Sequence, residues 1–242
     1  MIKRLSLIAS LLLAMAPAAF AQTCPVPPDL ALTDLSLPVS RQAVQQRRHL
    51  TIVALGGAST AGMAAGGIQY AYPARLEMLL REQLPGVQID MLNRGATAGT
   101  VRDRVQRIDA DLAGIKPDLV IWAPGSTEAG AAEDPDRFQA SLASGAARIK
   151  ESGADLMMID LQYSPKIAQV INLVPYDAAI ARTARQQNVA LLRRSALMRR
   201  WQEQSVLQLD GIPRGGRVAA IRHLSNCVAM ALADGIAPAV RP

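Results

Sequence analysis

The sequence predicts a three-layer α/β/α sandwich with a central parallel sheet of about five strands. Three observations favour this fold class. Short apolar, β-branched runs alternate with segments of helical periodicity, which is typical of parallel βαβ units. The 242 residues are 50% hydrophobic and only 3% aromatic, enough for one sizeable aliphatic core. Glycine and hydroxyl residues follow several of the apolar runs, where open α/β sheets bind ligands.

The first 21 residues are predicted to be a signal peptide. Lys3 and Arg4 precede an apolar run, and Ala19-Phe20-Ala21 forms a small-x-small cleavage site. The alternative, a buried N-terminal helix, stays open. We therefore expect a secreted, periplasmic protein with no transmembrane segment after signal removal. Its domains are predicted as a signal peptide (1–21), an N-terminal arm (22–48) and one α/β domain (49–242).

The elements of the first half are predicted from periodicity and breakers. The proline-rich arm is expected to turn helical near residues 41–48. The run LTIVALGG is typical of a buried strand that glycines end, and the helix that follows it stops at Pro85-Gly86. The predicted strands of this half are 50–57 and 87–95, and its predicted helices are 72–86 and 101–115.

The same alternation continues through the second half. The predicted strands are 118–125, 155–163 and 189–194, and the predicted helices are 134–153, 175–188, a segment reaching Trp201, and 218–235. The proline-containing segment 164–175 is expected to be irregular and could edge a cleft. The predicted fold has one domain, because the chain has no internal repeat or low-complexity linker.

The net charge and the small number of histidines and cysteines argue against a nucleic-acid-binding protein and against a metalloprotein. Loss of Lys3 and Arg4 lowers the formal charge from +6 to +4, which is mild. The arginines of segment 193–201 are expected to lie on a solvated helix face, not on a nucleic-acid surface. With two histidines and two cysteines in the chain, neither a metal site nor any other cofactor is expected.

Three motifs at predicted strand ends carry a resemblance to a known family. They are GGASTAG at 56–62, NRG at 93–95 and PGSTE at 124–128. In this order they resemble the SGNH (GDSL-type) hydrolases, closest to an exported bacterial branch, with a degenerate catalytic set. The resemblance implies a flavodoxin-like sandwich and acyl-transfer chemistry. In that chemistry a serine attacks, a histidine three residues after an aspartate acts as base, and an oxyanion hole stabilises the charge.

The first turn decides whether a nucleophile is present. When Thr60 and Gly62 anchor the family motif without a gap, the nucleophile position falls on Ala58, which has no hydroxyl. A slip of one residue would make Ser59 the nucleophile. Otherwise Ser59 is a turn hydroxyl that bonds local backbone, as serine commonly does after glycines.

The oxyanion hole is also incomplete in this reading. Gly95 matches the family's oxyanion glycine, and Asn93 precedes it in the family pattern. Thr127 stands where the family has an asparagine, just before Glu128. Loss of one such donor costs roughly 100- to 1000-fold in rate.

The catalytic base has no clear position. Asp210 begins the best match to Asp-x-x-His, but Pro213 occupies the histidine position. His223 has no acidic residue three positions before it. If it is not catalytic, it is expected to lie on the surface of a helix. His49 is expected at the opposite, amino edge of the sheet.

The two cysteines are far apart in sequence. In an oxidising compartment Cys24 and Cys227 are expected to form a disulfide that joins the N-terminal arm to the last helix. Two free buried thiols are the alternative.

Two functions follow from these residues. The first is a non-catalytic relative that binds an acylated glycan, a small ester or an envelope protein partner through a shared set of polar side chains: Ser59, Thr60, Asn93, Thr127, Glu128 and Tyr163. The second is an active esterase or deacetylase with Ser59 as nucleophile, His223 as base, and Asp210 or Glu128 orienting the base.

Overall fold

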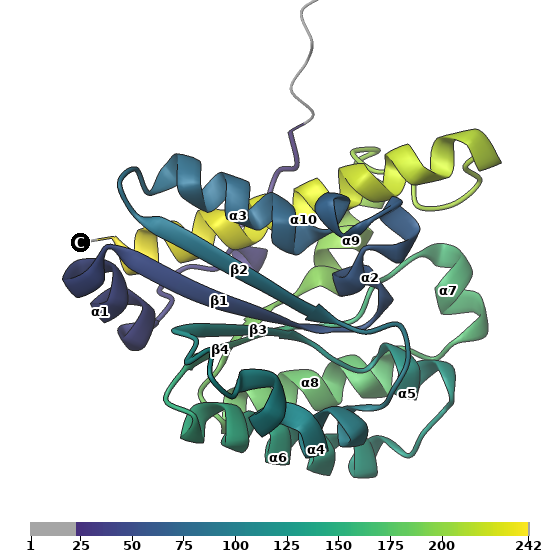
Figure 1. The fold of residues 1–242 in the computed structure, drawn as a ribbon. Coiled ribbons are helices and arrows are strands. Elements are labelled where there is room, and N and C mark those ends of the chain that lie inside the picture. The colour runs from purple at the N-terminus through teal and green to yellow at the C-terminus, as the bar shows by residue number, and fades with distance from the viewer. Residues whose placement is uncertain (1–22, 242) are drawn as a thin grey trace, which may run out of the picture.

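The computed structural model describes residues 23–241, which form one all-parallel sheet between two layers of helices (Figure 1). The strand order is β2-β1-β3-β4-β5. The strands are β1 (His49–Gly56), β2 (Gln88–Gly95), β3 (Leu119–Ala123), β4 (Asp155–Ile159) and β5 (Ala190–Leu192). The predicted fold class is confirmed. The predicted signal peptide lies outside the described residues.

The central strands are apolar on both faces because helices cover both. Every residue of β3 is buried, and β1 is buried from Ile52 to Gly56. Parallel strands covered on both sides read as continuous apolar runs for this reason. The strand ends are level, since Gly56 is paired with Gly95 of β2 and Ala123 of β3. The loops after these three strands therefore meet at one edge.

Helices α3 and α10 cover one face of the sheet with α1 and α9, and α4, α6 and α8 cover the other (Figure 1). Short helices α2, α5 and α7 lie near the carboxyl ends of the strands. The α-helices are α1 (Pro38–Arg47), α2 (Ala58–Ala61), α3 (Tyr72–Gln83), α4 (Val101–Leu112), α5 (Ser126–Gly130), α6 (Pro135–Glu151), α7 (Pro165–Val170), α8 (Val174–Gln186), α9 (Arg194–Glu203) and α10 (Arg217–Val240). Short 3-10 turns occupy Pro28–Leu30, Met63–Ala65, Ile68–Tyr70 and Arg214–Gly216.

Two expectations about the second half are wrong. Segment 164–175 is not wholly irregular, because α7 begins after Ser164, whose side chain accepts from the Ile167 N–H. Proline at the first position of this helix is compatible with helix geometry. The last helix also runs beyond residue 235 to Val240, since its final turns are buried against the core.

The N-terminal arm is tied to the helical layer of α10. Cys24 and Cys227 form a disulfide, as the first of the two alternatives for the cysteines predicts. The Trp201 indole N–H of α9 also donates to the Pro25 carbonyl at 2.8 Å. Within residues 23–241, no helix is both long and apolar enough to cross a membrane.

The strand order places a topological switch point between β1 and β3. The chain leaves β1 toward β2 on one side and returns to β3 on the other. In open parallel sheets the loops diverge at such a point and leave a crevice beyond the strand ends. This crevice is the expected position of a functional site.

Candidate functional site at the carboxyl edge of the sheet

The turn after β1 presents a methyl group to solvent. Helix α2 begins at Ala58, which is exposed, whereas Ser59 is half-buried and Thr60 is fully buried. The turn ends at Gly62, whose φ of +78° favours glycine. The turn is packed tightly against β1, because a Cβ at Gly56 would overlap the Thr60 side chain.

The Ser59 hydroxyl points to a buried arginine. Nη1 of Arg194, at the start of α9, donates to the Ser59 Oγ at 3.4 Å. Arg194 is its one hydrogen-bond partner within the described part of the chain. A guanidinium has no acceptor, so it cannot remove a proton from the hydroxyl. The Ser59 oxygen is therefore held by a donor and not by a base.

Arg194 is 2% exposed and lies among ionisable groups that are also buried. The expectation that the arginines of segment 193–201 are all solvated is wrong at this residue. Burial lowers the pKa of Arg194, and the carboxylates of Asp160 and Asp177 oppose that shift. Burial, together with the nearby Asp177, raises the pKa of Asp160 to about 7. Asp160 also accepts from the Ser195 N–H at 2.8 Å.

The loop after β2 is fastened to the same turn by Asn93. Its side-chain amide donates to the Thr60 carbonyl at 2.6 Å, and its Oδ1 accepts from the Gly95 N–H at 2.9 Å. A Cβ at Gly95 would overlap the backbone of Thr60 and Ala61. Gly95 is thus required for close packing, and its N–H is already bonded to Asn93.

The loop after β3 holds one buried carboxylate and two exposed hydroxyls. Gly125 has a φ of +96°, and Ser126 and Thr127 after it are exposed. Glu128 is 2% exposed, and its Oε1 accepts from the Val101 N–H at the start of α4. Burial raises the pKa of Glu128. The carboxylate therefore links the loops after β2 and β3.

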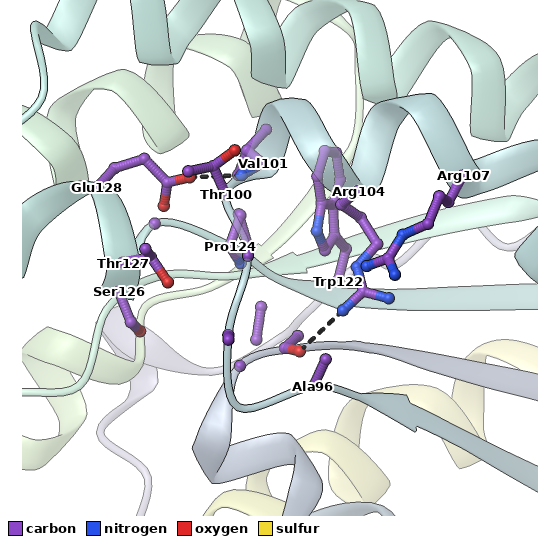
Figure 2. A pocket seen from close by; sticks show the side chains of 16 residues that line it. Ala96, Thr100, Val101, Arg104, Arg107, Trp122, Pro124, Ser126, Thr127 and Glu128 are labelled. Carbon is purple, nitrogen blue, oxygen red and sulfur yellow. Dashed lines mark hydrogen bonds between the residues drawn. The ribbon is translucent and has the colours of Figure 1, made fainter.

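A small cavity lies between the three loops, at the switch point (Figure 2). The cavity volume that is accessible to water is about 30 Å³. The wider opening around it, which includes bulk solvent, is about 390 Å³. Its polar lining comes from Thr100, Arg104, Arg107, Ser126, Thr127 and Glu128. Thr127 and Glu128 are predicted as site residues from the sequence, whereas Arg104 and Arg107 are not. Their spacing of three residues on an amphipathic helix is the sequence signal that places them on one helix face.

The other predicted site residues lie elsewhere. His223 Nε2 is 3.7 Å from the Cys227 Sγ, and burial lowers the pKa of this imidazole. Asp210 accepts from the Lys166 N–H at 2.8 Å. Neither side chain hydrogen-bonds to Ser59 within residues 23–241. The Tyr163 ring lies 3.9 Å from the guanidinium carbon of Arg199, away from the cavity lining.

His49 lies at the amino end of β1, as expected, 2.7 Å from the Asp90 carboxylate. In the described chain, one group of three potential metal ligands occurs: Cys24, His223 and Cys227, within 4.8 Å of one another. The two sulfurs are bonded to each other, so this group does not provide a thiolate site.

The chain has an SGNH esterase-like fold. The crystal structure of TesA matches at a TM-score of 0.60 and 22% identity, covering 75% of this chain and 97% of that one. Axe2, an acetylxylan esterase from Geobacillus stearothermophilus, matches at a TM-score of 0.59 and 19% identity, covering 77% and 94%. The acetyl xylan esterase AlAXEase matches at 0.62 and 14%, covering 77% and 100%. These likenesses confirm the predicted fold.

The chain belongs to the non-GDSL lipase-like family, which matches residues 23–242. No curated protein matches its sequence.

Proposed function

We propose that this chain is an exported, non-hydrolysing member of its family that binds an acylated glycan or a related ester-bearing envelope ligand. The observation that carries the proposal is the first turn. The exposed side chain there is the Ala58 methyl, and the neighbouring Ser59 hydroxyl accepts a hydrogen bond from the buried Arg194. A nucleophilic serine needs a base at about 2.6–3.2 Å, and an arginine cannot act as one.

The other catalytic elements support the same proposal. The Gly95 N–H, a family oxyanion donor, bonds the Asn93 side chain. The His223 ring contacts the disulfide, and the Asp210 carboxylate binds the backbone of α7. In a related fold, Axe2 variants in which alanine replaces a serine or a histidine are catalytic mutants. A serine and a histidine are therefore counted among the catalytic residues of at least one structural relative.

The ligand class and location rest on the cavity, the relatives and the disulfide. The cavity retains exposed hydroxyls at Ser126 and Thr127 beside the strand ends. Two structural relatives are acetylxylan esterases, which supports a glycan with ester groups. The Cys24–Cys227 bond and the predicted signal peptide support an oxidising compartment outside the cytoplasm.

The test is hydrolysis of p-nitrophenyl acetate by the protein without residues 1–21, beside Ser59→Ala and His223→Ala. Matched controls are Ser144→Ala, at an exposed helix position, and His49→Ala, the other histidine. We expect a rate equal to that of the buffer for all five proteins, and no labelling by a serine-directed fluorophosphonate. Hydrolysis that both Ser59→Ala and His223→Ala abolish, while the controls keep it, would establish the esterase alternative instead.

A further inference from the structure

We infer that the switch-point cavity binds the carboxylate of an acidic saccharide, and that Arg104 and Arg107 supply the cationic contacts. This inference rests on the proposed function, because it takes the inherited cleft as the ligand site. It names a ligand chemistry, a uronate-type saccharide, that the acetylated glycans of the structural relatives do not imply.

Both guanidinium groups reach the cavity from one helix. Arg104 and Arg107 are three residues apart on α4, so they lie on the same helix face. Both line the cavity, and Figure 2 shows them extending toward the end of β1, with Ser126 and Thr127 across the opening. Two guanidinium groups at one opening suit a planar carboxylate, which accepts parallel N–H bonds.

Arg104 is already fixed in the position that this role requires. Its Nη2 donates to the Gly56 carbonyl at 3.3 Å, and its Nη1 pairs with Asp111 at 3.1 Å. The side chain is only 11% exposed. A guanidinium carries five N–H donors, so these two contacts leave others for a ligand. Because the Arg104 side chain is already ordered in the folded protein, it loses little conformational entropy when a ligand binds.

Arg107 supplies the charge that is more available to a ligand. It is exposed, and among residues 23–241 it forms no ion pair. The nearby carboxylates have other partners: Asp111 pairs with Arg104, Asp103 accepts from the Thr100 N–H, and Glu128 accepts from the Val101 N–H. The cation of Arg107 therefore makes no close ion pair, and the Asp103 carboxylate on the same helix, whose pKa it helps to lower, offsets its charge only in part, which favours an anionic ligand.

The size and lining of the cavity indicate which part of the ligand enters. The space of about 30 Å³ admits a carboxylate but not a sugar ring. The remaining ligand must lie outside, over the exposed hydroxyls of Ser126 and Thr127, which can bond saccharide hydroxyls. The nonpolar wall consists mainly of small residues such as Ala96, Ala98 and Pro124, which offer little area to an acyl chain.

The experiment is calorimetric titration of the protein without residues 1–21 at low salt. Glucuronate is compared with its methyl ester, which differs mainly in lacking the charge. The test variant is Arg107→Gln. The matched control is Arg102→Gln, which removes the same charge from the same helix at an exposed residue outside the cavity lining. Arg104 is left unchanged because it supports the Gly56 carbonyl.

We expect glucuronate to bind at least tenfold more tightly than its methyl ester. Arg107→Gln should weaken glucuronate binding about tenfold, and Arg102→Gln less than twofold. Equal binding of acid and ester, an equal loss in both variants, or no glucuronate binding overturns the inference. The hydrolysis assay reports separately on the proposed function. Ester hydrolysis with glucuronate binding would indicate an esterase for acidic glycans, whereas neither result would leave a non-hydrolysing protein with a neutral ligand.

Discussion

The carboxyl edge of the sheet has two halves that use the same residue types differently. At the ends of β1, β2 and β3, Arg104 and Arg107 line a small opening with exposed hydroxyls. At the ends of β4 and β5, Asp160 and Arg194 are at most 6% exposed, and Arg194 donates to the Ser59 hydroxyl oxygen. The first half presents the exposed charge of Arg107 to solvent beside the buried Arg104, whereas the second half encloses both Asp160 and Arg194.

The difference follows from what each cation contacts. Arg107 is exposed, so water solvates its charge and the folded protein has almost no desolvation penalty there. The charge remains available to a ligand. The charge of Arg194 is desolvated and is tolerated only beside Asp160 and Asp177. We therefore expect the open half to govern binding, and the enclosed half to govern stability and its dependence on pH.

The largest expected effect is on the free energy of unfolding, when the buried cation of Arg194 is removed. Arg194→Met removes the coulombic attraction between the buried guanidinium and the carboxylates of Asp160 and Asp177, together with its hydrogen bond to Ser59, so the free energy of unfolding should fall by up to about 3 kcal/mol. Urea denaturation at neutral pH measures it. Arg200→Met, at an exposed residue of the same helix, should change this free energy by less than about 0.5 kcal/mol. Equal effects of the two variants would show that the two halves do not differ in this respect.

A smaller effect is expected from the pH dependence of the enclosed half. The pKa of Asp160 is raised to about 7 in the folded protein, so its protonated form is favoured by folding. This contribution to stability is complete below about pH 4 and is lost as the pH rises to about 7.

Asp160→Asn keeps a neutral side chain at all pH values. The decrease in unfolding free energy between pH 5 and pH 7.5 should therefore be about 2 kcal/mol smaller in this variant than in the unmodified protein. Asp136→Asn, at an exposed residue of α6, should leave the decrease unchanged. A pH profile of Asp160→Asn that overlays that of the unmodified protein would contradict the assignment.

The smallest expected effect concerns the open half. Glu128→Gln retains an oxygen that can accept from the Val101 N–H but removes a negative charge from the cavity lining. Glucuronate affinity should rise about two- to threefold, with little change in stability. Calorimetric titration of the variant measures this effect. Weaker binding would mean that the Glu128 carboxylate itself contacts the ligand.

Most elements of the fold follow from local pattern. The strand that begins near Leu50 and the helix beginning at Tyr72 are predicted within a few residues, because continuous apolar runs and breakers such as Pro85 are local signals. Helix α7 is not predicted, because a helix of six residues that begins with a proline carries too little periodicity. Its Ser164 cap is a local signal that could have indicated it.

The candidate site was predictable only in part. The methyl at Ala58 and the replacement at Thr127 are visible as residue types at fixed motif positions. The partner of Ser59 is not, since Arg194 is 135 residues away and sits in an arginine-rich segment that looks solvated. Likewise, only the packing of α4 against the strand ends brings Arg104 to the Gly56 carbonyl.

The order of residues alone predicts the alternation of strands and helices, the resemblance to SGNH hydrolases and the absence of a hydroxyl at residue 58. These properties depend on residue type and short-range order. The packing of the folded chain is needed to tell which arginine is enclosed, which one lines the opening, and what the His223 ring contacts. The electrostatic free energy of a charged side chain depends on its burial and on its distance from other charges. Neither quantity can be deduced from the neighbouring residues in the sequence.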